Sequence, residues 1–526
     1  MIMSFRFRWG DTDKGMDAKE RIIEQRMARR RRTQLILKTI IALLILVAVL
    51  LITILVRAGM RDGFFEEQWQ QLVQSVTGGS GSDGAEGVSE AVTVQADTGV
   101  TRQERQEAVL AQAELMAAQY DYEGAIRLLQ MDEDYDLSTA LQNAVAAYRS
   151  ARETLVSYPV SEVTHIFFHI LIYDTDLAFD GDLDAAGYNQ VMATVSEFNS
   201  ILEQMYERGY VMVGLHDLCE TDEDGQVSQG EIRLPEGKIP FVLSQDDVCY
   251  YHYMDGDGFA SRLVVDEDGR VRCLYEEEDG TQTIGDYDLV PIIDTFVEQH
   301  PDFAYHGHKG VIALTGYEGV LGYRTDEVYR TRDEDRLTSF QKAYLEEHPD
   351  FDFEEQVREA TEVAEAMKAS GWEFASHTWG HIAPLEKGYE RTVTDTQRWQ
   401  DNVAPIVGDT DILIFAFGAD INDWTAYTSD NEYFRMYKEA GFNIFCNVDG
   451  SQTHWIQFGD DYMRMSRRNV DGYRMYYNPD LLGDLFDVAE AWDDARPTPV
   501  TPMASELETQ ADTQADTQAE GDNADA

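Results

Sequence analysis

Apolar and polar residues in 159–495 follow a pattern typical of strands that alternate with helices. Three amphipathic helical segments, at 188–208, 354–370 and 432–440, each end at a glycine that is followed by a short apolar strand. Glycine after the last turn readily takes the left-handed conformation that ends a helix. The strands after these glycines are expected at 210–215, 372–376 and 442–446, and further strands at 165–172, 239–243, 310–314 and 411–417.

This alternation predicts the fold class of the main domain. Strands that alternate with helices favour an α/β protein with a parallel sheet, and about seven strands fit a (β/α) barrel better than a small open sheet. Residues 260–284 interrupt the pattern with a polar stretch around Asp266–Gly269, which indicates an inserted hairpin. The barrel domain is therefore expected to span 159–495.

A second helical pattern precedes the barrel, at 101–158. Apolar residues recur there at helical spacing, and residues 117–129 resemble the turn and second helix of a tetratricopeptide unit. Stable arrays of such units need about three repeats. Only one or one and a half fit in this segment, so a small spacer is expected rather than a peptide-binding array.

The N-terminal region predicts a membrane anchor. The run Leu35–Val56 is interrupted only by Lys38, Thr39 and Thr53, and about 20 apolar residues suffice to cross a bilayer. We therefore expect a transmembrane helix at 34–57, with a cleaved signal peptide as the closest alternative, although 56–60 lacks its small-residue cleavage pattern. Arginines 29–32 place segment 1–33 in the cytoplasm and the rest of the chain outside, beyond a Gly/Ser-rich flexible linker at 58–100.

The charge of the chain limits its partners. The chain has 42 Lys and Arg residues and 98 Asp and Glu residues, which gives a formal net charge of -56. This charge repels nucleic acid and other polyanions. Segment 497–526 contains no Lys or Arg, and 496–526 is expected to be a disordered acidic tail. The four cysteines lack the CxxC spacing of a zinc ribbon, so buried thiols are favoured, with one disulfide bridge left open.

Two motifs at strand ends carry candidate chemistry. Asp246 and Asp247 follow the strand 239–243, and the pair His377 and His381 follows the strand 372–376. Histidines four residues apart lie on one side of a helical turn and can converge on one ion. Two histidines and one carboxylate leave coordination positions open for water and substrate. The residue after His377 is Thr378, not the glutamate that a metalloprotease requires.

These motifs resemble those of a known enzyme family. Residues 244–247 (SQDD) look like the TFDD motif, and residues 377–381 (HTWGH) match the HTxxH motif, of the polysaccharide deacetylases. Members of this family are metal-dependent enzymes with a distorted (β/α) barrel that remove acetyl groups from N-acetylated sugars. The resemblance implies that Asp246 is the general base. It also implies that Asp247, His377 and His381 bind a divalent cation, with Zn²⁺ preferred.

Two further motifs of the family are absent. The family's proton donor is a histidine in a Leu-x-His motif, and segment 463–472 contains no histidine. His454 is the nearest substitute in the sequence and is the candidate acid, with a structural or surface role equally open. The Arg-x-Pro motif is also absent near 415–420. His165 and His169 share one face of the first strand, where His169 has a place at the barrel mouth, although a core role is favoured.

The leading hypothesis is a membrane-anchored, extracytoplasmic deacetylase of an N-acetylhexosamine polymer in the cell wall or on the surface. The alternative is a catalytically degenerate barrel that binds glycan or organises the envelope, and an O-acetyl ester substrate also stays open. Nucleic acid is excluded as a partner, and the oligomeric state is not determined by sequence. Six aromatic residues suit stacking on sugars, although most aromatics belong to the core: Tyr250, Tyr251, Tyr253, Trp379, Trp424 and Trp455.

Overall fold

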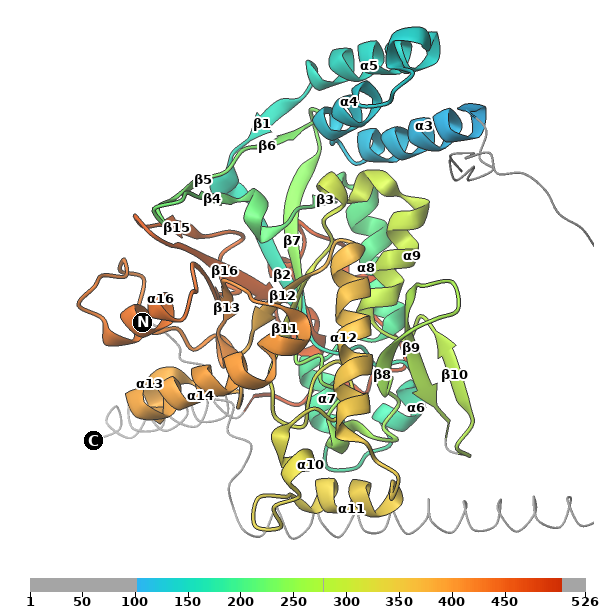
Figure 1. Ribbon diagram of the computed structural model, residues 1–526. Coiled ribbons are helices and arrows are strands. Elements are labelled where there is room, and N and C mark those ends of the chain that lie inside the picture. The colour runs from blue at the N-terminus through green and yellow to red at the C-terminus, as the bar shows by residue number, and fades with distance from the viewer. Residues whose placement is uncertain (1–101, 278, 504–526) are drawn as a thin grey trace, which may run out of the picture. The chain divides into compact units, whose positions relative to one another are not determined.

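The computed structural model describes residues 102–277 and 279–503 (Figure 1). The expected cytoplasmic segment, transmembrane helix and linker, at 1–33, 34–57 and 58–100, lie outside the described residues. Within the part that is described, no helix is both long enough and apolar enough to cross a membrane.

Three helices occupy the segment for which the sequence predicts a helical spacer. They are α3 (Arg102–Ala118), α4 (Tyr122–Gln130) and α5 (Thr139–Arg152). Asp121 caps α4 by accepting a hydrogen bond of 2.7 Å from the backbone N–H of Gly124, and Ser138 caps α5. The three helices share a small apolar core of their own, which includes Ala113, Leu129 and Leu141.

Seven parallel strands close into a ring, so the predicted (β/α) barrel is confirmed. Around the ring, each strand pairs with the next, and the last pairs with the first. The order is β2 (Thr164–Phe168), β7 (Ile239–Asp246), β11 (Val311–Leu314), β12 (Glu373–Ser376), β13 (Ile412–Ile414), β14 (Ile444–Val448) and β16 (Met463–Asn469).

The membership of the ring differs from the prediction at two strands. β3 (Tyr210–Met212) was expected in the barrel, but it pairs with 239–241 at the start of β7 and, on its other side, forms just one bridge, from Met212 to Ala304. β11 takes over the same edge of β7 at 244–246, which distorts the barrel at this point. The strand that completes the ring is β16, whose three arginines hide its apolar pattern in the sequence. β15 (Ile456–Phe458) runs antiparallel beside it.

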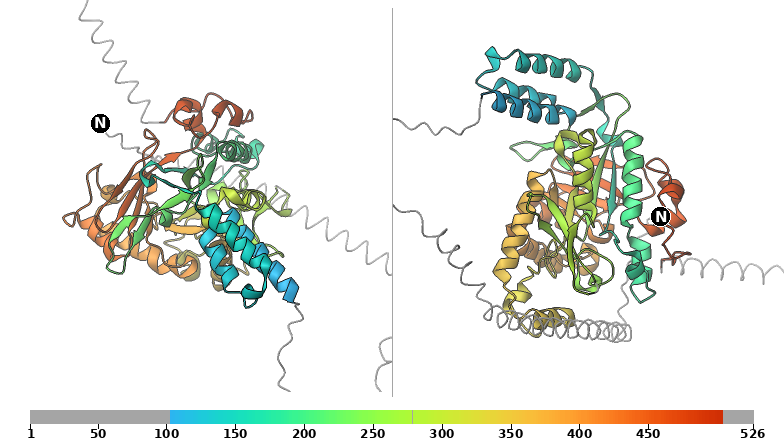
Figure 2. Two further views of the ribbon diagram at one scale, coloured as in Figure 1. Left: turned by 90° about the horizontal axis from the view of Figure 1, so that it is seen from above. Right: turned by 90° about the vertical axis from the view of Figure 1, so that its right-hand side faces the viewer.

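Long helices cover the outside of the ring (Figures 1 and 2). α8 (Val195–Glu207), α9 (Leu289–Gln299) and α12 (Phe353–Ala369) pack through apolar residues against outward-facing side chains of the strands. The helix predicted at 188–208 is broken, because Thr194 caps α8 in a capping box with Glu197. The preceding piece is α7 (Ala185–Val191).

The remaining elements are short. The predicted hairpin insertion is a three-stranded antiparallel sheet of β8 (Arg262–Val265), β9 (Val271–Glu276) and β10 (Gln282–Gly285). Two small antiparallel sheets have two strands each: β1 (Val156–Tyr158) pairs with β6 (Ile232–Leu234), and β4 (Cys219–Thr221) forms a hairpin with β5 (Val227–Gln229). The other α-helices are α6 (Thr175–Ala178), α10 (Glu327–Thr331), α11 (Ser339–Glu347), α13 (Pro384–Lys387), α14 (Tyr389–Asn402), α15 (Ala404–Val407), α16 (Glu432–Glu439), α17 (Gly472–Tyr477) and α18 (Val488–Ala491).

Side chains of the barrel strands alternate between the interior and the helix layer. Along β7, Phe241 and Leu243 pack against the helices, whereas Val242 joins the core inside the ring. This alternation continues to Ser244 and Asp246, which therefore point inward near the carboxyl end of the strand. The interior core also contains Val311, Ala313, Ala375, Ile412, Ile414, Ile444, Cys446, Met463 and Met465.

The C-terminal boundary lies later than expected. Arg496, which the sequence places in the acidic tail, is buried and donates hydrogen bonds to Glu197, one of them 2.7 Å long. The carbonyl of Val500 accepts a hydrogen bond of 2.7 Å from the hydroxyl of Tyr477. The packed domain therefore extends past 495, and residues 504–526 lie outside the described chain.

The four cysteines are all buried and free, as the favoured interpretation of their spacing predicts. Burial raises the pKa of the Cys219, Cys249 and Cys446 thiols to about 12, so they are protonated at neutral pH. They therefore act as small apolar side chains.

Candidate metal centre

Two adjacent carboxylates lie at the carboxyl end of β7. Successive residues of a strand normally point to opposite faces, but Asp247 has a left-handed backbone with φ of 63°. Its N–H still donates to the carbonyl of Ala313 at 3.1 Å, so the chain stays attached to β11. The left-handed residue breaks the alternation and lets both Asp246 and Asp247 face the barrel mouth.

The two candidate histidines lie in the loop after β12. The expected helical turn is wrong, because Thr378 and His381 have left-handed φ values of 60° and 48°. The carboxylate of Asp395 holds this tight turn by accepting hydrogen bonds from the N–H of Trp379 at 2.7 Å and of Gly380 at 2.9 Å. The turn still brings His377 and His381 together, with ring centroids 5.0 Å apart.

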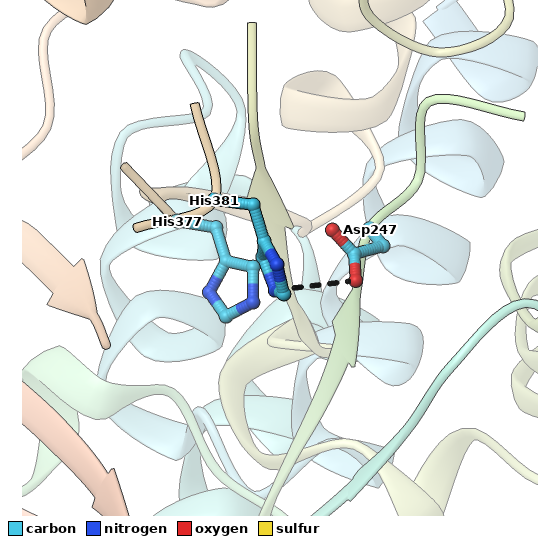
Figure 3. A group of neighbouring side chains, drawn as sticks. All are labelled: Asp247, His377 and His381. Atoms are coloured by element: carbon cyan, nitrogen blue, oxygen red, sulfur yellow. Dashed lines mark ion pairs between the residues drawn. The ribbon is translucent and has the colours of Figure 1, made fainter. Parts of the chain in front are cut away.

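The three predicted ligands meet at one point (Figure 3). Asp247, His377 and His381 each offer one ligand atom within 4.8 Å of the others. Nε2 of His381 lies 3.6 Å from Oδ2 of Asp247. The two motifs are far apart in the sequence, and the barrel brings their strand ends to the same mouth.

Hydrogen bonds orient two of these ligands. Nδ1 of His377 donates to the carbonyl of Ile414 at 2.9 Å, which leaves the lone pair on Nε2 for a metal. The hydroxyl of Tyr251 donates to Oδ1 of Asp247 at 2.8 Å, which leaves Oδ2 towards His381. Such outer partners fix the tautomer and direction of ligands in metal sites.

The protonation states also suit a cation. Burial lowers the pKa of His381 to about 4, despite the opposing effect of Asp247. Burial acts to raise the pKa of Asp247, but the neighbouring His381 and His377 hold it below its usual range. At neutral pH the site therefore offers a neutral imidazole at His381 and an ionised carboxylate, which is the form that ligands must have. The donor set fits Zn²⁺ or a similar divalent cation.

Asp246 is buried beside the triad and paired with Arg467. Arg467 donates two parallel hydrogen bonds to it, of 2.7 Å and 2.9 Å, and a third of 3.1 Å to the hydroxyl of Ser244. Oδ2 of Asp246 lies 3.8 Å from Nε2 of His377. Burial alone would raise the pKa of Asp246, but the Arg467 charge, with a further effect of the neighbouring His377, holds it well below its usual range.

Sequence reasoning missed Arg467. It comes from β16, 221 residues after Asp246, in a segment noted only for lacking a histidine. Its guanidinium lies 4.1 Å from the ring centre of Phe167, inside the barrel. The alternation of Met463, Met465 and Arg467 along one face is the only signal in the sequence that directs the arginine inward.

His169 belongs to the site. It follows the last residue of β2, on the inward face, and is half-buried. The preceding residue, Phe168, pairs with Gln245 in β7, so His169 lies beside Asp246 in the register of the two strands. It also adds a lesser effect that lowers the pKa of Asp246, Asp247 and His381. Nδ1 donates to the carbonyl of Val191 at 3.0 Å, so Nε2 is available. The core role favoured from the sequence is therefore wrong for His169.

The other two histidines behave differently. His165 is buried inside the barrel, with Nε2 at 2.9 Å from the hydroxyl of Ser244, as expected for a core residue. His454 is exposed, and its hydrogen bond is to the hydroxyl of Thr453 at 3.1 Å. In the described part of the chain, no ion pair or hydrogen bond connects His454 to Asp246 or to the triad.

Comparisons with known proteins give one distant likeness. A Streptococcus pyogenes deacetylase, PplD, solved in complex with acetate, aligns over 63% of this chain and 99% of its own, with 10% sequence identity and a TM-score of 0.31. No family model and no curated protein matches the chain. Because this likeness is so distant, the chemistry of the site is derived from its own side chains.

Proposed function

We propose that this protein is a metal-dependent deacetylase that removes N-acetyl groups from a polysaccharide of the cell wall or surface. The observation that carries the proposal is the meeting of Asp247, His377 and His381 next to a carboxylate, Asp246, that is not one of the three ligands. Hydrolysis of an amide at such a site needs both parts, because a carboxylate that binds the cation cannot also be a free base.

Each residue of the chain has a distinct task. A divalent cation held by the triad supplies activation of water and polarisation of the acetyl carbonyl. Asp246 accepts the proton of the attacking water, and Arg467 fixes the direction in which its oxygens point. The bidentate pair keeps Asp246 ionised at every pH at which the enzyme is expected to work.

His169 replaces His454 as the proposed proton donor to the departing amine. Its Nδ1 remains bonded to the carbonyl of Val191, while Nε2 takes up and releases the proton. A proton donor directly after β2 would take the place of a histidine after the last strand, where the sequence has none.

One observation favours a second candidate function. The two hydrogen bonds from Arg467 make Asp246 a weak base, because they stabilise its ionised form. A barrel with a metal site and an inactive carboxylate would bind glycan or organise the envelope without turnover. This alternative shares the ligands and differs only in what Asp246 does.

We further propose that residues 34–57 anchor the chain in the cell membrane, with the barrel outside. The net charge of -56 would repel anionic polymers such as teichoic acids, so an uncharged hexosamine chain is the proposed substrate. An O-acetyl ester would need the same ligands, and a comparison of substrates distinguishes the two.

The test measures acetate released by the full-length protein in detergent, with added Zn²⁺ or Co²⁺ and with a chelator. Substrates are chitooligosaccharide, peptidoglycan and acetylated xylan. Asp246→Asn should abolish release while the protein keeps its metal, and the matched Asp449→Asn, which follows β14 in the same ring, should change neither. Absence of release from all three substrates by the metal-loaded wild type would favour the scaffold.

A further inference from the structure

Two tryptophans form a pair on loops that follow neighbouring barrel strands. Trp424 lies after β13 and Trp455 after β14, with ring centroids 5.0 Å apart and planes at 81°. The side chain of Trp424 is 41% exposed and Trp455 is half-buried. Neither belongs to the apolar clusters of the barrel core in the described residues. The pair therefore presents aromatic surface that folding does not use.

Buried Arg464 holds the loop of Trp424 in place. It donates hydrogen bonds of 2.9 Å to the carbonyls of Asp423 and Thr425, and one of 2.6 Å to the carboxylate of Asp420. Its guanidinium also lies 5.2 Å from the ring centre of Trp455. The backbone on both sides of Trp424 is thus held in place before any ligand arrives, which reduces the entropy lost on binding.

Short segments of the chain connect the pair to the metal centre. The loop of Trp424 begins beside Phe417, whose ring lies 4.2 Å from that of His381. The carbonyl of Trp455 accepts a hydrogen bond of 3.0 Å from the N–H of Ser466, and the next residue, Arg467, holds Asp246. Both tryptophans are therefore connected through short segments to the residues that carry the proposed chemistry.

The surroundings of the pair are polar. Asp423, Thr425 and Ala426 around Trp424 are exposed, as are residues 451–454 before Trp455. A protein interface would surround such aromatics with further apolar area, whereas a small aromatic patch among polar groups suits the apolar face of a sugar ring. Asp423 and Asp449 add negative charge, which disfavours an anionic polymer.

We propose that Trp424 and Trp455 form a sugar-binding platform for a hexosamine chain that is uncharged or carries free amines. The platform binds units distant from the one whose acetyl group is removed, and so selects polymer over monomer. This inference rests on the proposed function for the identity of the chain. The binding of sugar to the platform itself does not require turnover.

The experiment measures the affinity of the full-length protein for chitohexaose by calorimetry. Trp424→Ala and Trp455→Ala should each weaken binding about tenfold, the size of effect typical of an aromatic anchor. Trp424→Phe should retain most of the affinity. The matched control is Trp492→Ala, since Trp492 is also half-buried but packs on Tyr476, near α18. Equal affinity in the wild type and both alanine variants would overturn the proposal.

A second measurement separates this inference from the proposed function. Acetate release from monomeric N-acetylglucosamine should be the same in Trp424→Ala and the wild type, whereas release from the hexamer should fall at low substrate concentration. Equal loss on monomer and hexamer would contradict a platform. Trp-dependent binding by a protein that releases no acetate would support the platform and refute the enzyme. Equally tight, Trp-dependent binding of hyaluronan would refute the selection against anionic chains.

Discussion

Arg467 and Asp246 form a two-point ion pair across the interior of the barrel, with hydrogen bonds of 2.7 Å and 2.9 Å between groups that are almost fully buried. The pair joins β16 to β7, which are separated in the ring by β2. The ion pair determines both the orientation and the basicity of the Asp246 carboxylate, which lies next to the triad. The proposed function of the site therefore depends on Arg467 as much as on the three candidate ligands.

Replacing Arg467 by lysine should change the pH dependence of the reaction. Arg467→Lys keeps the charge but loses the fork of two hydrogen bonds, so the pKa of Asp246 should rise. Because Asp246 must be ionised to accept a proton, the acidic limb of kcat/KM should move to higher pH. The rate at neutral pH should fall at least about tenfold through lost orientation.

The matched control for that substitution is Arg468→Lys. Arg468 is also buried in β16 but faces outward, where it bonds to Asp484 at 2.7 Å. Its variant should keep the pH profile of the wild type. Identical profiles for the two variants would show that Arg467 has no special relation to the reaction.

His169 and His454 can be separated as proton donors. His169→Gln should lower kcat on an N-acetylated sugar by about 10² to 10⁴. Hydrolysis of an activated aryl acetate should be spared, because its leaving group needs no proton. His454→Gln should leave both substrates unaffected. The assignment fails if His454→Gln shows the loss and His169→Gln does not.

The lowered pKa of His381 predicts how stability depends on pH in the metal-free protein. Its folded pKa of about 4 lies below the unfolded value of 6.5, so the unfolded chain binds the proton first as the pH falls. The free energy of unfolding should decrease from pH 6.5 to pH 4, by at most about 3 kcal/mol.

Urea unfolding of the chelated protein measures this effect. His381→Asn should flatten the decrease between pH 6.5 and pH 4, whereas replacement of the exposed His348 by asparagine should leave it unchanged. An unchanged slope in His381→Asn would mean that His381 is not held neutral by burial.

His216 predicts the opposite sign at the amino ends of the strands. Hydrogen bonds to Asp411, at 2.9 Å, and to Glu373 raise its pKa to about 10. A raised folded pKa contributes stability that is fully present below the unfolded pKa and is lost as the pH rises through 10. The difference in urea midpoint between the wild type and His216→Gln should therefore shrink from pH 6 to pH 10. A difference that is constant over this range would contradict the ion-paired histidine.

The three candidate ligands could be predicted from the sequence because they lie in short local motifs. Asp247, His377 and His381 lie at strand ends, and parallel strands bring their carboxyl ends to one face. The turn that holds the histidines is not helical, but residues four positions apart can converge on one point in this turn as well as in a helix. The convergence of the three side chains is therefore confirmed, for a reason partly different from the one expected.

The residues that contact or surround these candidate ligands could not be predicted from the sequence. Arg467 pairs with a residue 221 positions away, and its strand contains so many charges that a surface position is the natural expectation. His169 required knowledge of which face of β2 points inward. The burial of Arg496 was not predicted, because the segment that follows it contains acidic residues and prolines and is typical of a disordered tail. In each case a long-range contact decided the outcome.

The most direct test of the central claim is the metal content of the full-length protein after dialysis against Zn²⁺. The wild type and Asp246→Asn should each retain about one zinc ion per chain, because Asp246 is not a ligand in the proposed site. Asp247→Asn and His377→Ala should lose it, while His348→Ala should not. Equal zinc retention by His377→Ala and the wild type would contradict the site.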